Sequence, residues 1–171
     1  MELYGDRGFD QTTVAEIAER AGLTERTFFR HFADKREVLF WGAGALQDGL
    51  VSAVAGAPAQ LGPMDAVAAG LEVIGGYMQE RERSRRRQHI IAANPELLER
   101  ELIKLASLSA ALADTLRGRG VTEPAASLSA EAGISIFKVA FERWIGETEE
   151  RDLRQLMRES LEELRAVTAG R

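Results

Sequence analysis

The chain has 171 residues, of which 45% are apolar and 29% charged, a composition typical of a globular protein with a buried core and not of a disordered chain. It contains no cysteine, which excludes disulfides, thiolate zinc sites, iron–sulfur clusters and cysteine nucleophiles. It contains only two histidines, which are too few for most metal sites. The net charge of −5 argues against a protein that coats nucleic acid or anionic membranes everywhere, although it is compatible with a local basic face. No signal-peptide pattern and no apolar run approaching about 18 residues occur, so we expect a cytoplasmic protein.

The first part of the chain, up to residue 37, is predicted to form short helices. Thr13 begins one of them, because its hydroxyl can cap the helix while Glu16 returns a hydrogen bond, an arrangement called a capping box. Gly22 is expected to end that helix in a left-handed conformation. A second short helix follows from Thr24, and Asp34 begins the next helix.

The remainder of the chain is predicted to form six longer helices. The first of them runs from Asp34 through Val54, although it contains three glycines that each weaken a helix. The start signals of the later helices include Pro63, Asn94-Pro95, Thr122-Glu123-Pro124 and Thr148-Glu149-Glu150. No alternating pattern typical of β-strands occurs, so the predicted fold class is all-α, with a division between residues 37 and 38.

The stretch from Thr12 to Lys35 has the pattern of a helix-turn-helix motif, in which two helices are joined by a tight glycine turn and the second helix enters the major groove of DNA. In the second helix Arg26 can form a bidentate pair with guanine, Glu25 can accept a hydrogen bond from cytosine, and Thr27 can offer its methyl or hydroxyl group. The predicted base contacts here are Thr24, Glu25, Arg26 and Thr27. The predicted phosphate contacts are Thr13, Arg30, His31 and Lys35.

The charge around this motif is locally positive. Residues 20–36 carry five basic and two acidic side chains, a net charge of +3, whereas residues 1–40 carry a net charge of −2. We therefore expect weak non-specific DNA binding at physiological salt. Glycine-turn helix pairs also occur in proteins that never contact DNA, and Phe28 and Phe32 are expected to lie in the core of the motif.

The residues in and around the motif resemble the DNA-binding domain of the tetracycline-repressor (TetR) family over residues 3 to 40. The resemblance is carried by Leu3-Tyr4, Arg7-Gly8-Phe9, Thr12-Thr13-Val14, Ile17-Ala18, Ala21-Gly22-Leu23 and Thr27-Phe28-Phe29-Arg30-His31-Phe32, together with Lys35 and Leu39. It implies a helix-turn-helix DNA-binding domain in residues 1–37 and a helical ligand-binding and dimerisation domain in residues 38–171. In such regulators the last two helices of each subunit usually pair into a four-helix bundle, and the middle helices enclose an effector pocket.

Two features depart from the family pattern. Position 29 is often tyrosine, whose hydroxyl contacts a phosphate, so Phe29 is expected instead to contact a base methyl group or a sugar. The chain also starts inside the expected first helix, and a helix shortened in this way is marginal on its own. We therefore expect a loosely held DNA-binding head in this chain.

The apolar groups of the later helices are assigned to two sites by the resemblance. The predicted effector-pocket residues, for which plain core packing is the alternative, are Trp41, Tyr77, Met78, His89, Phe137, Phe141 and Trp144. The predicted dimer-interface residues are Ile134, Phe137, Phe141, Leu153, Leu156 and Leu164. The arginines between Arg81 and Arg87 have three open interpretations: a solvated helix face paired with Glu80 and Glu82, a nucleic-acid contact, or a contact with the DNA-binding head.

The sequence thus predicts a ligand-responsive transcriptional regulator, a repressor by family tendency, that binds a near-palindromic operator as a homodimer and is released by a small, largely apolar effector. The alternative hypothesis is a helical small-molecule-binding protein with a vestigial or non-functional DNA-binding head. Without cysteine, paired carboxylates or a nucleophile motif, the chain is not expected to be an enzyme. We also expect no metal, no cofactor and no membrane partner.

Overall fold

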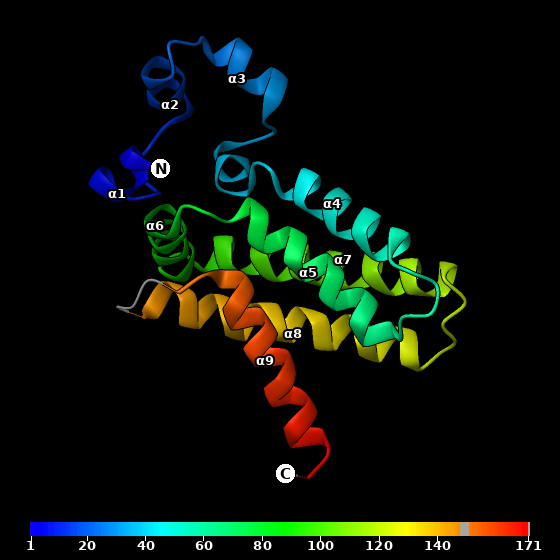
Figure 1. Cartoon of the computed structure of the whole chain (residues 1–171). Coiled ribbons are helices and arrows are strands. Elements are labelled where there is room, and N and C mark those ends of the chain that lie inside the picture. The colour runs from blue at the N-terminus through cyan, green and yellow to red at the C-terminus, as the bar shows by residue number, and fades with distance from the viewer. Residues whose placement is uncertain (148–150, 171) are drawn as a thin grey trace. The chain divides into compact units, whose positions relative to one another are not determined.

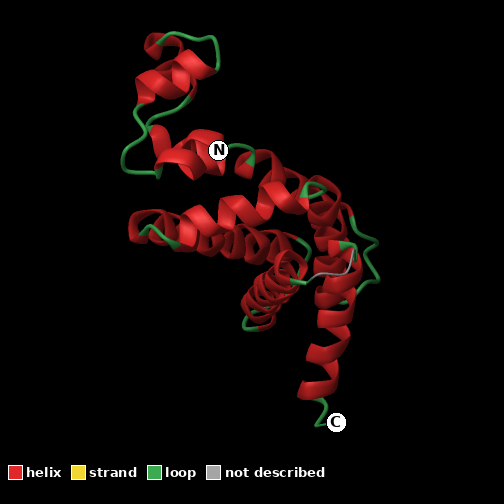
Figure 2. Cartoon of the chain, turned by 90° about the vertical axis from the view of Figure 1, so that its left-hand side faces the viewer, coloured by secondary structure: helices red, strands yellow, loops and turns green. Residues whose placement is uncertain are grey.

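A computed structural model of the chain describes residues 1–147 and 151–170, and these residues form helices and loops but no strand (Figure 2). In chain order the helices are α1 Glu2–Arg7, α2 Val14–Arg20, α3 Glu25–His31, the 3-10 helix η1 Lys35–Phe40, α4 Ala43–Gly56, α5 Pro63–Tyr77, α6 Arg81–Ala92, α7 Pro95–Gly118, α8 Ala125–Gly146 and α9 Leu153–Thr168 (Figure 1). The predicted all-α fold class is confirmed.

The chain divides into two units that do not coincide with the predicted domains. The head unit contains Met1–Ala43 and Glu82–Glu101, and the bundle unit contains Gly44–Arg81 and Leu102–Arg171. The predicted division between residues 37 and 38 had placed all of α6 and α7 with the second domain. In the structure, α6 from Glu82 onward and the first two turns of α7 instead belong with the helix-turn-helix.

The core of the head unit explains this division. Its buried apolar side chains come from α1 and the following loop, from η1, and from α6 and the first turn of α7; they are Tyr4, Phe9, Leu39, Phe40, Ile90, Ile91 and Leu97. Arg87 of α6 adds polar contacts, because its Nε donates to the Leu39 carbonyl at 2.7 Å and its guanidinium lies 5.1 Å from the Phe40 ring centroid. Of the three interpretations of the arginine run, contact with the head therefore applies to Arg87, while Arg85 pairs with Glu82.

The helix predicted from Asp34 through Val54 is interrupted. Asp34 caps η1 by accepting hydrogen bonds from the backbone N–H groups of Arg36 and Glu37. The chain then leaves helical geometry at Trp41 and Gly42, where Gly42 has a φ of +91° that favours glycine, and α4 begins at Ala43. A single continuous helix is thus a wrong prediction for this segment.

The same segment, Lys35–Gly56, has a mean hydropathy of 1.3 and enough length to cross a membrane on composition alone. Four of its large apolar side chains lie in protein cores, however, since Leu39 and Phe40 are buried in the head unit and Leu50 and Val54 in the bundle unit. The interruption at Gly42 also separates the segment into two pieces that are each too short to span a bilayer.

Within the bundle unit, α5, α8 and α9 pack against one another (Figure 1). α9 is strongly amphipathic, with Leu153, Leu156 and Leu161 buried on one side and charged residues on the other. Asp152 caps α9 by accepting from the backbone N–H of Arg154. The helix start predicted at residues 148–150 lies outside the described residues.

Candidate nucleic-acid interface and ligand cavity

The turn between α2 and α3 follows from local sequence signals. The predicted capping box is present: the Thr13 hydroxyl accepts from the Glu16 backbone N–H, and the Glu16 carboxylate accepts from the Thr13 backbone N–H at 2.8 Å. Hydrogen bonds from the Thr13 backbone and side chain hold the pKa of Glu16 below its usual value. Gly22 has a φ of +69°, and the N–H of Leu23 donates to the Ala18 carbonyl at 2.8 Å, which closes the C-terminus of α2.

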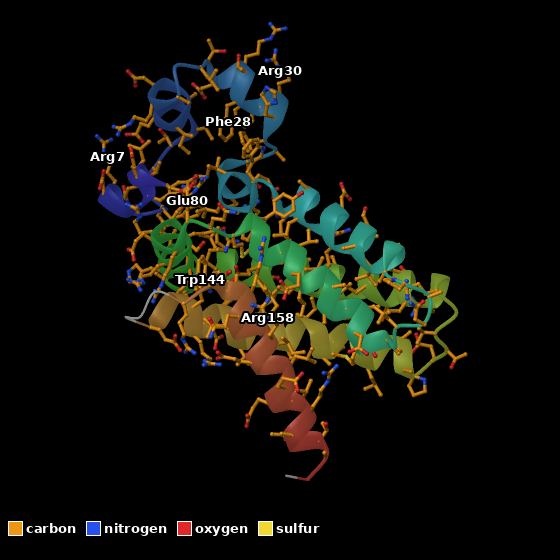
Figure 3. All side chains as sticks on the ribbon, viewed as in Figure 1. Arg7, Phe28, Arg30, Glu80, Trp144 and Arg158 are labelled. Carbon is orange, nitrogen blue, oxygen red and sulfur yellow. The ribbon has the colours of Figure 1, made fainter. Side chains whose placement is uncertain are left out.

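α3 has an inner and an outer side. Phe28 is buried, and its ring meets that of Phe29 edge-on at 5.5 Å between centroids. On the outer side Glu25, Arg26 and Arg30 are exposed, and Phe29 exposes 54% of its surface. Figure 3 shows Arg30 reaching outward from α3, with Phe28 on the opposite, inner side. Apart from half-buried Thr27, the predicted base-contact residues therefore lie on an exposed surface.

The arginines of the head unit differ in their ion pairing. Three on the supporting elements are paired with carboxylates: Arg7 with Glu16, Arg20 with Glu2, and Arg36 with Asp34. Within the described residues, neither Arg26 nor Arg30 of α3 is paired with a carboxylate. Their positive charge is thus available to an external anion, and guanidinium groups are well suited to phosphate and guanine.

The α3 helix is also well formed at its start. The Thr24 hydroxyl accepts from the Thr27 backbone N–H at 3.2 Å and lies 3.1 Å from the Thr27 hydroxyl. Thr24 thereby caps the helix while its own surface remains exposed. The Thr24 cap therefore fixes the geometry of the first turn of α3. This is the part of a recognition helix that contacts base edges in the major groove.

The predicted phosphate contacts fall into two groups. Thr13, Arg30 and His31 are exposed, as a phosphate contact requires. Lys35 differs, because its ammonium donates to the carbonyls of Phe9, Asp10 and Thr12 at 2.8, 3.2 and 3.0 Å. All three of its donors are directed at the loop before α2, so the structure gives Lys35 a role inside the head in place of the predicted phosphate contact.

Lys35→Met is expected to lower the free energy of unfolding of the head by about 2 kcal/mol, because a charged donor of three hydrogen bonds is removed. It should leave the salt dependence of DNA binding unchanged. Arg30→Gln should have the opposite profile: stability changes by less than about 0.5 kcal/mol, while the slope of log K against log salt falls by about one for each subunit. Denaturant unfolding and DNA titrations at several salt concentrations measure both quantities.

A reduced salt slope in Lys35→Met with unchanged stability would contradict this role. It would mean that the ammonium leaves the three carbonyls and binds a phosphate when DNA is present.

Two polar contacts that the sequence analysis missed fix the short first helix. The hydroxyl of buried Tyr4 donates to the Lys35 carbonyl, which joins α1 to η1. Thr12 is fully buried and its hydroxyl lies within hydrogen-bond distance of the carbonyls of Leu3 and Gly8. The six-residue α1 therefore does not depend on its own helical stability, and the expected loosely held head finds no support in these contacts. A threonine beside the capping Thr13 was the available signal, but periodicity alone does not distinguish a buried hydroxyl from an exposed one.

The predicted pocket residues do not gather in one place. Met78 and Trp144 line a cavity of about 430 Å3 in the bundle unit, where α5 and α8 end and α9 begins. Phe137 and Phe141 are buried in the core of the unit with their rings 5.7 Å apart, so the alternative of core packing applies to them.

The other three predicted pocket residues are exposed, which corrects their assignment. Trp41 exposes 76% of its surface in the interruption between η1 and α4. Tyr77 is the last residue of α5 and is exposed, and His89 lies on the outer side of α6, next to buried Ile90. Apolar or aromatic character at helical spacing did not distinguish these surface positions from a pocket wall.

The predicted dimer-interface residues are mostly used inside the protomer. Buried in the core of the bundle unit are Ile134, Phe137, Phe141, Leu153 and Leu156, and Leu164 is partly buried against that core. These side chains are therefore not available as an exposed dimer face. On α8 the large exposed apolar side chains are Leu128 and Val139, with Ser135 between them on the same side of the helix.

A metal site receives no support from the side-chain positions: among the described residues, no group of three or more His, Asp or Glu side chains could hold a metal ion. Both histidines, His31 and His89, are exposed.

Comparison with known proteins gives matches over both parts of the chain. Residues 1–40 match the family described as "Bacterial regulatory proteins, tetR family", and residues 61–169 match the "MftR C-terminal domain". The HTH-type transcriptional regulator TcmR of Streptomyces glaucescens is 34% identical over 82 residues. That match covers 48% of this chain and 36% of TcmR, so it spans about a third of the relative's length.

Two solved structures resemble the fold. A candidate TetR-family transcriptional regulator from Mesorhizobium loti superimposes with a TM-score of 0.60 at 22% identity, covering 97% of this chain and 91% of that one. PfmR, a TetR-family transcriptional regulator from Thermus thermophilus, superimposes with a TM-score of 0.52 at 21% identity, covering 94% and 91%. At these identities the two structures support the fold alone.

Proposed function

Since this chain belongs to the tetracycline-repressor (TetR) family of bacterial regulatory proteins, we propose that it is a ligand-responsive transcriptional repressor. It binds a near-palindromic operator as a homodimer and leaves the DNA when a small-molecule effector binds. Membership of the family makes it a transcriptional regulator; the repressor role, the dimer and the effector response are our proposal. We further propose that it acts in the cytoplasm, without enzymatic activity or a cofactor.

The observation that carries the DNA-binding proposal is that the exposed arginines of α3 are not engaged in ion pairs within the described residues. Its exposed arginines, Arg26 and Arg30, have no carboxylate partner in the described part of the chain, while Arg7 and Arg20 on the supporting helices are paired. In the proposed complex Arg26 reads a guanine, and Arg30 with Thr13 and His31 contacts phosphates. Two copies of α3 in successive major grooves, about 34 Å apart, would read the two halves of a near-palindrome.

The proposed dimer uses α8, one of the last two helices. Leu128 and Val139 expose apolar surface on one side of α8, and a second copy of this chain can cover that side in a two-fold arrangement. The resemblance to a family whose last helices form a four-helix bundle supports a second copy as the occupant.

The proposed effector response runs through α7. This single helix, Pro95–Gly118, supplies residues to both units. In the head unit its Arg100 pairs with Glu37 of η1, and Glu96 lies 3.7 Å from Arg36. A shift of α7 on effector binding would thus reach η1 and change the spacing of the two recognition helices. A 100-fold loss of DNA affinity requires about 2.7 kcal/mol, which is within the usual range of coupling free energies.

Selection of bound duplexes from a randomised pool at near-physiological salt tests the proposal. Enrichment of an inverted repeat is expected. Arg26→Ala should then weaken binding to the selected site by about 1–3 kcal/mol and relax the preference at one base pair in each half-site. Arg7→Ala, which removes a paired arginine from the same unit, serves as the control and should leave the preference intact.

Equal weakening on all sequences by Arg26→Ala would contradict base reading by this residue. A failure to enrich any duplex would favour the second candidate, a helical small-molecule-binding protein with a non-functional head.

A further inference from the structure

The cavity at the ends of α5 and α8 combines an apolar wall with an unusual number of arginines. Met78, Trp144 and Leu153 form the apolar part, and Trp144 is only 4% exposed. Arg81, Arg151 and Arg154 also line it. All of these residues belong to the bundle unit. The volume of about 430 Å3 lies in the range of small-molecule sites, which is about 300–1,000 Å3.

Arg154 lies directly on the backbone of α5, at a place that only glycines leave open. A Cβ atom added at Gly75 would be 2.3 Å from Arg154 Cγ, and one added at Gly76 would be 2.6 Å from Arg154 Nη2. Consecutive glycines inside a helix weaken it, by about 1 kcal/mol each relative to alanine, so their presence here needs a compensating role. The lack of side chains at these two positions leaves room for Arg154 beside the cavity.

Arg154 has a side-chain donor that no acceptor among the described residues uses. Its Nε is buried without a hydrogen-bond partner, and within the described residues no carboxylate pairs with it. Arg151 differs, because it is paired with Glu147 and Glu159. Asp152 also lines the cavity, but its carboxylate accepts from the backbone N–H of Arg154 as the cap of α9.

We propose that this cavity is the effector site and that it takes a small organic anion, a carboxylate or sulfonate on an apolar body, whose acid group is bound by Arg154. A guanidinium matches the geometry of such an acid group with two parallel hydrogen bonds. The apolar body of the ligand would lie against Trp144 and Met78.

This inference rests on the proposed regulatory function only in calling the occupant an effector. It also sharpens the expectation of a largely apolar effector, since the arginine requires an acid group at one end. A neutral molecule of the same shape would leave the guanidinium without its partner.

Two fluorescent probes of matching shape test the site in the intact chain. 1-Anilinonaphthalene-8-sulfonate carries an aromatic body and a sulfonate, and N-phenyl-1-naphthylamine is the same body without the sulfonate. The chain has two tryptophans, so Trp41→Phe leaves Trp144 as the sole donor for energy transfer to a probe in the cavity. We expect energy transfer from Trp144, and at least about tenfold tighter binding of the sulfonate than of the neutral probe.

Variants then assign the preference to the guanidinium. Arg154→Gln should reduce binding of the sulfonate to the level of the neutral probe and leave the neutral probe unaffected. Gly76→Ala keeps the charge but displaces the end of the Arg154 side chain, a flexible group that can move without disturbing the fold, and should also weaken the sulfonate selectively. Arg158→Gln is the matched control: it removes a charge one turn further along α9, where Arg158 pairs with Glu72, and should change neither affinity.

Equal affinity for the two probes, absence of energy transfer from Trp144, or an unchanged sulfonate affinity in Arg154→Gln would each overturn the proposal. If Arg154→Gln fails to fold, Gly76→Ala decides in the same way. Duplex selection separates this inference from the proposed function. If the sulfonate preference is missing but a duplex is enriched, the anion site is wrong and the DNA-binding proposal stands. If no duplex is bound but the sulfonate preference is present, the regulatory role is wrong and the anion site stands.

Discussion

Leu156→Glu is expected to unfold the bundle unit and not to produce a folded monomer. Leu156 is 0% exposed in the core that α5, α8 and α9 form together. A carboxylate placed in this apolar core is removed from solvent, so it must either remain charged at a high cost or take up a proton. We expect the free energy of unfolding to fall by more than about 4 kcal/mol, measured by urea unfolding followed through circular dichroism.

Val139→Glu is the contrasting variant for the dimer. Val139 is 51% exposed on α8, so glutamate can be accommodated in the isolated protomer. In a two-fold dimer through this face of α8, each carboxylate would be buried against apolar side chains of the second copy, which favours dissociation. Light scattering should therefore give the mass of a monomer with unchanged helicity. A folded dimer from Val139→Glu would place the interface elsewhere, and a folded monomer from Leu156→Glu would restore the interface predicted from the sequence.

Ile91→Ala should abolish DNA binding although it lies far from the helix-turn-helix in the sequence. Ile91 is 0% exposed in the core of the head unit, with Tyr4, Phe9 and Leu39. Removing three carbon atoms from such a position costs about 2–5 kcal/mol, a large part of the stability of a small unit. We expect loss of operator affinity at 37 °C, measured by gel shift, together with faster amide hydrogen exchange in α1 and η1.

His89→Ala is the control for this variant, because His89 lies two residues earlier on α6 and is exposed. It should change stability by less than about 0.5 kcal/mol. Binding of the sulfonate probe to the cavity should survive Ile91→Ala, since the cavity belongs to the bundle unit. Loss of probe binding with retained DNA binding would show that Ile91 supports the bundle and not the head.

The parts of the fold that the sequence predicted are those set by local interactions. The capping box at Thr13 and Glu16 and the left-handed Gly22 involve residues only a few positions apart, and each was found where expected. The interruption at Gly42 was not predicted, because glycines lower the stability of a helix without showing at which residue the helix breaks.

The missed features depend on contacts between distant residues. Lys35 had the charge and position of a phosphate contact, and only the folded chain shows that the carbonyls of Phe9 and Thr12 occupy its donors. Phe141 and Trp144 have the same apolar character and helical spacing and are both buried in the core of the bundle unit, yet of the two Trp144 alone also lines the cavity. Periodicity identifies the side of a helix that is buried but not what that side contacts.

Because the head unit is assembled from two separate stretches of chain, a single crossover cannot transfer it between two regulators without also carrying Gly44–Arg81 of the bundle unit. A hybrid joined just after Ala43 would combine one protein's recognition helix with another's Ile90, Ile91 and Leu97, and the two halves of the core would have to fit by chance. Changes of DNA specificity are therefore easier to achieve by substitutions on the exposed side of α3 than by exchange of whole domains. The residues that read DNA can thus vary independently, while those of α6 must change in step with α1 and η1.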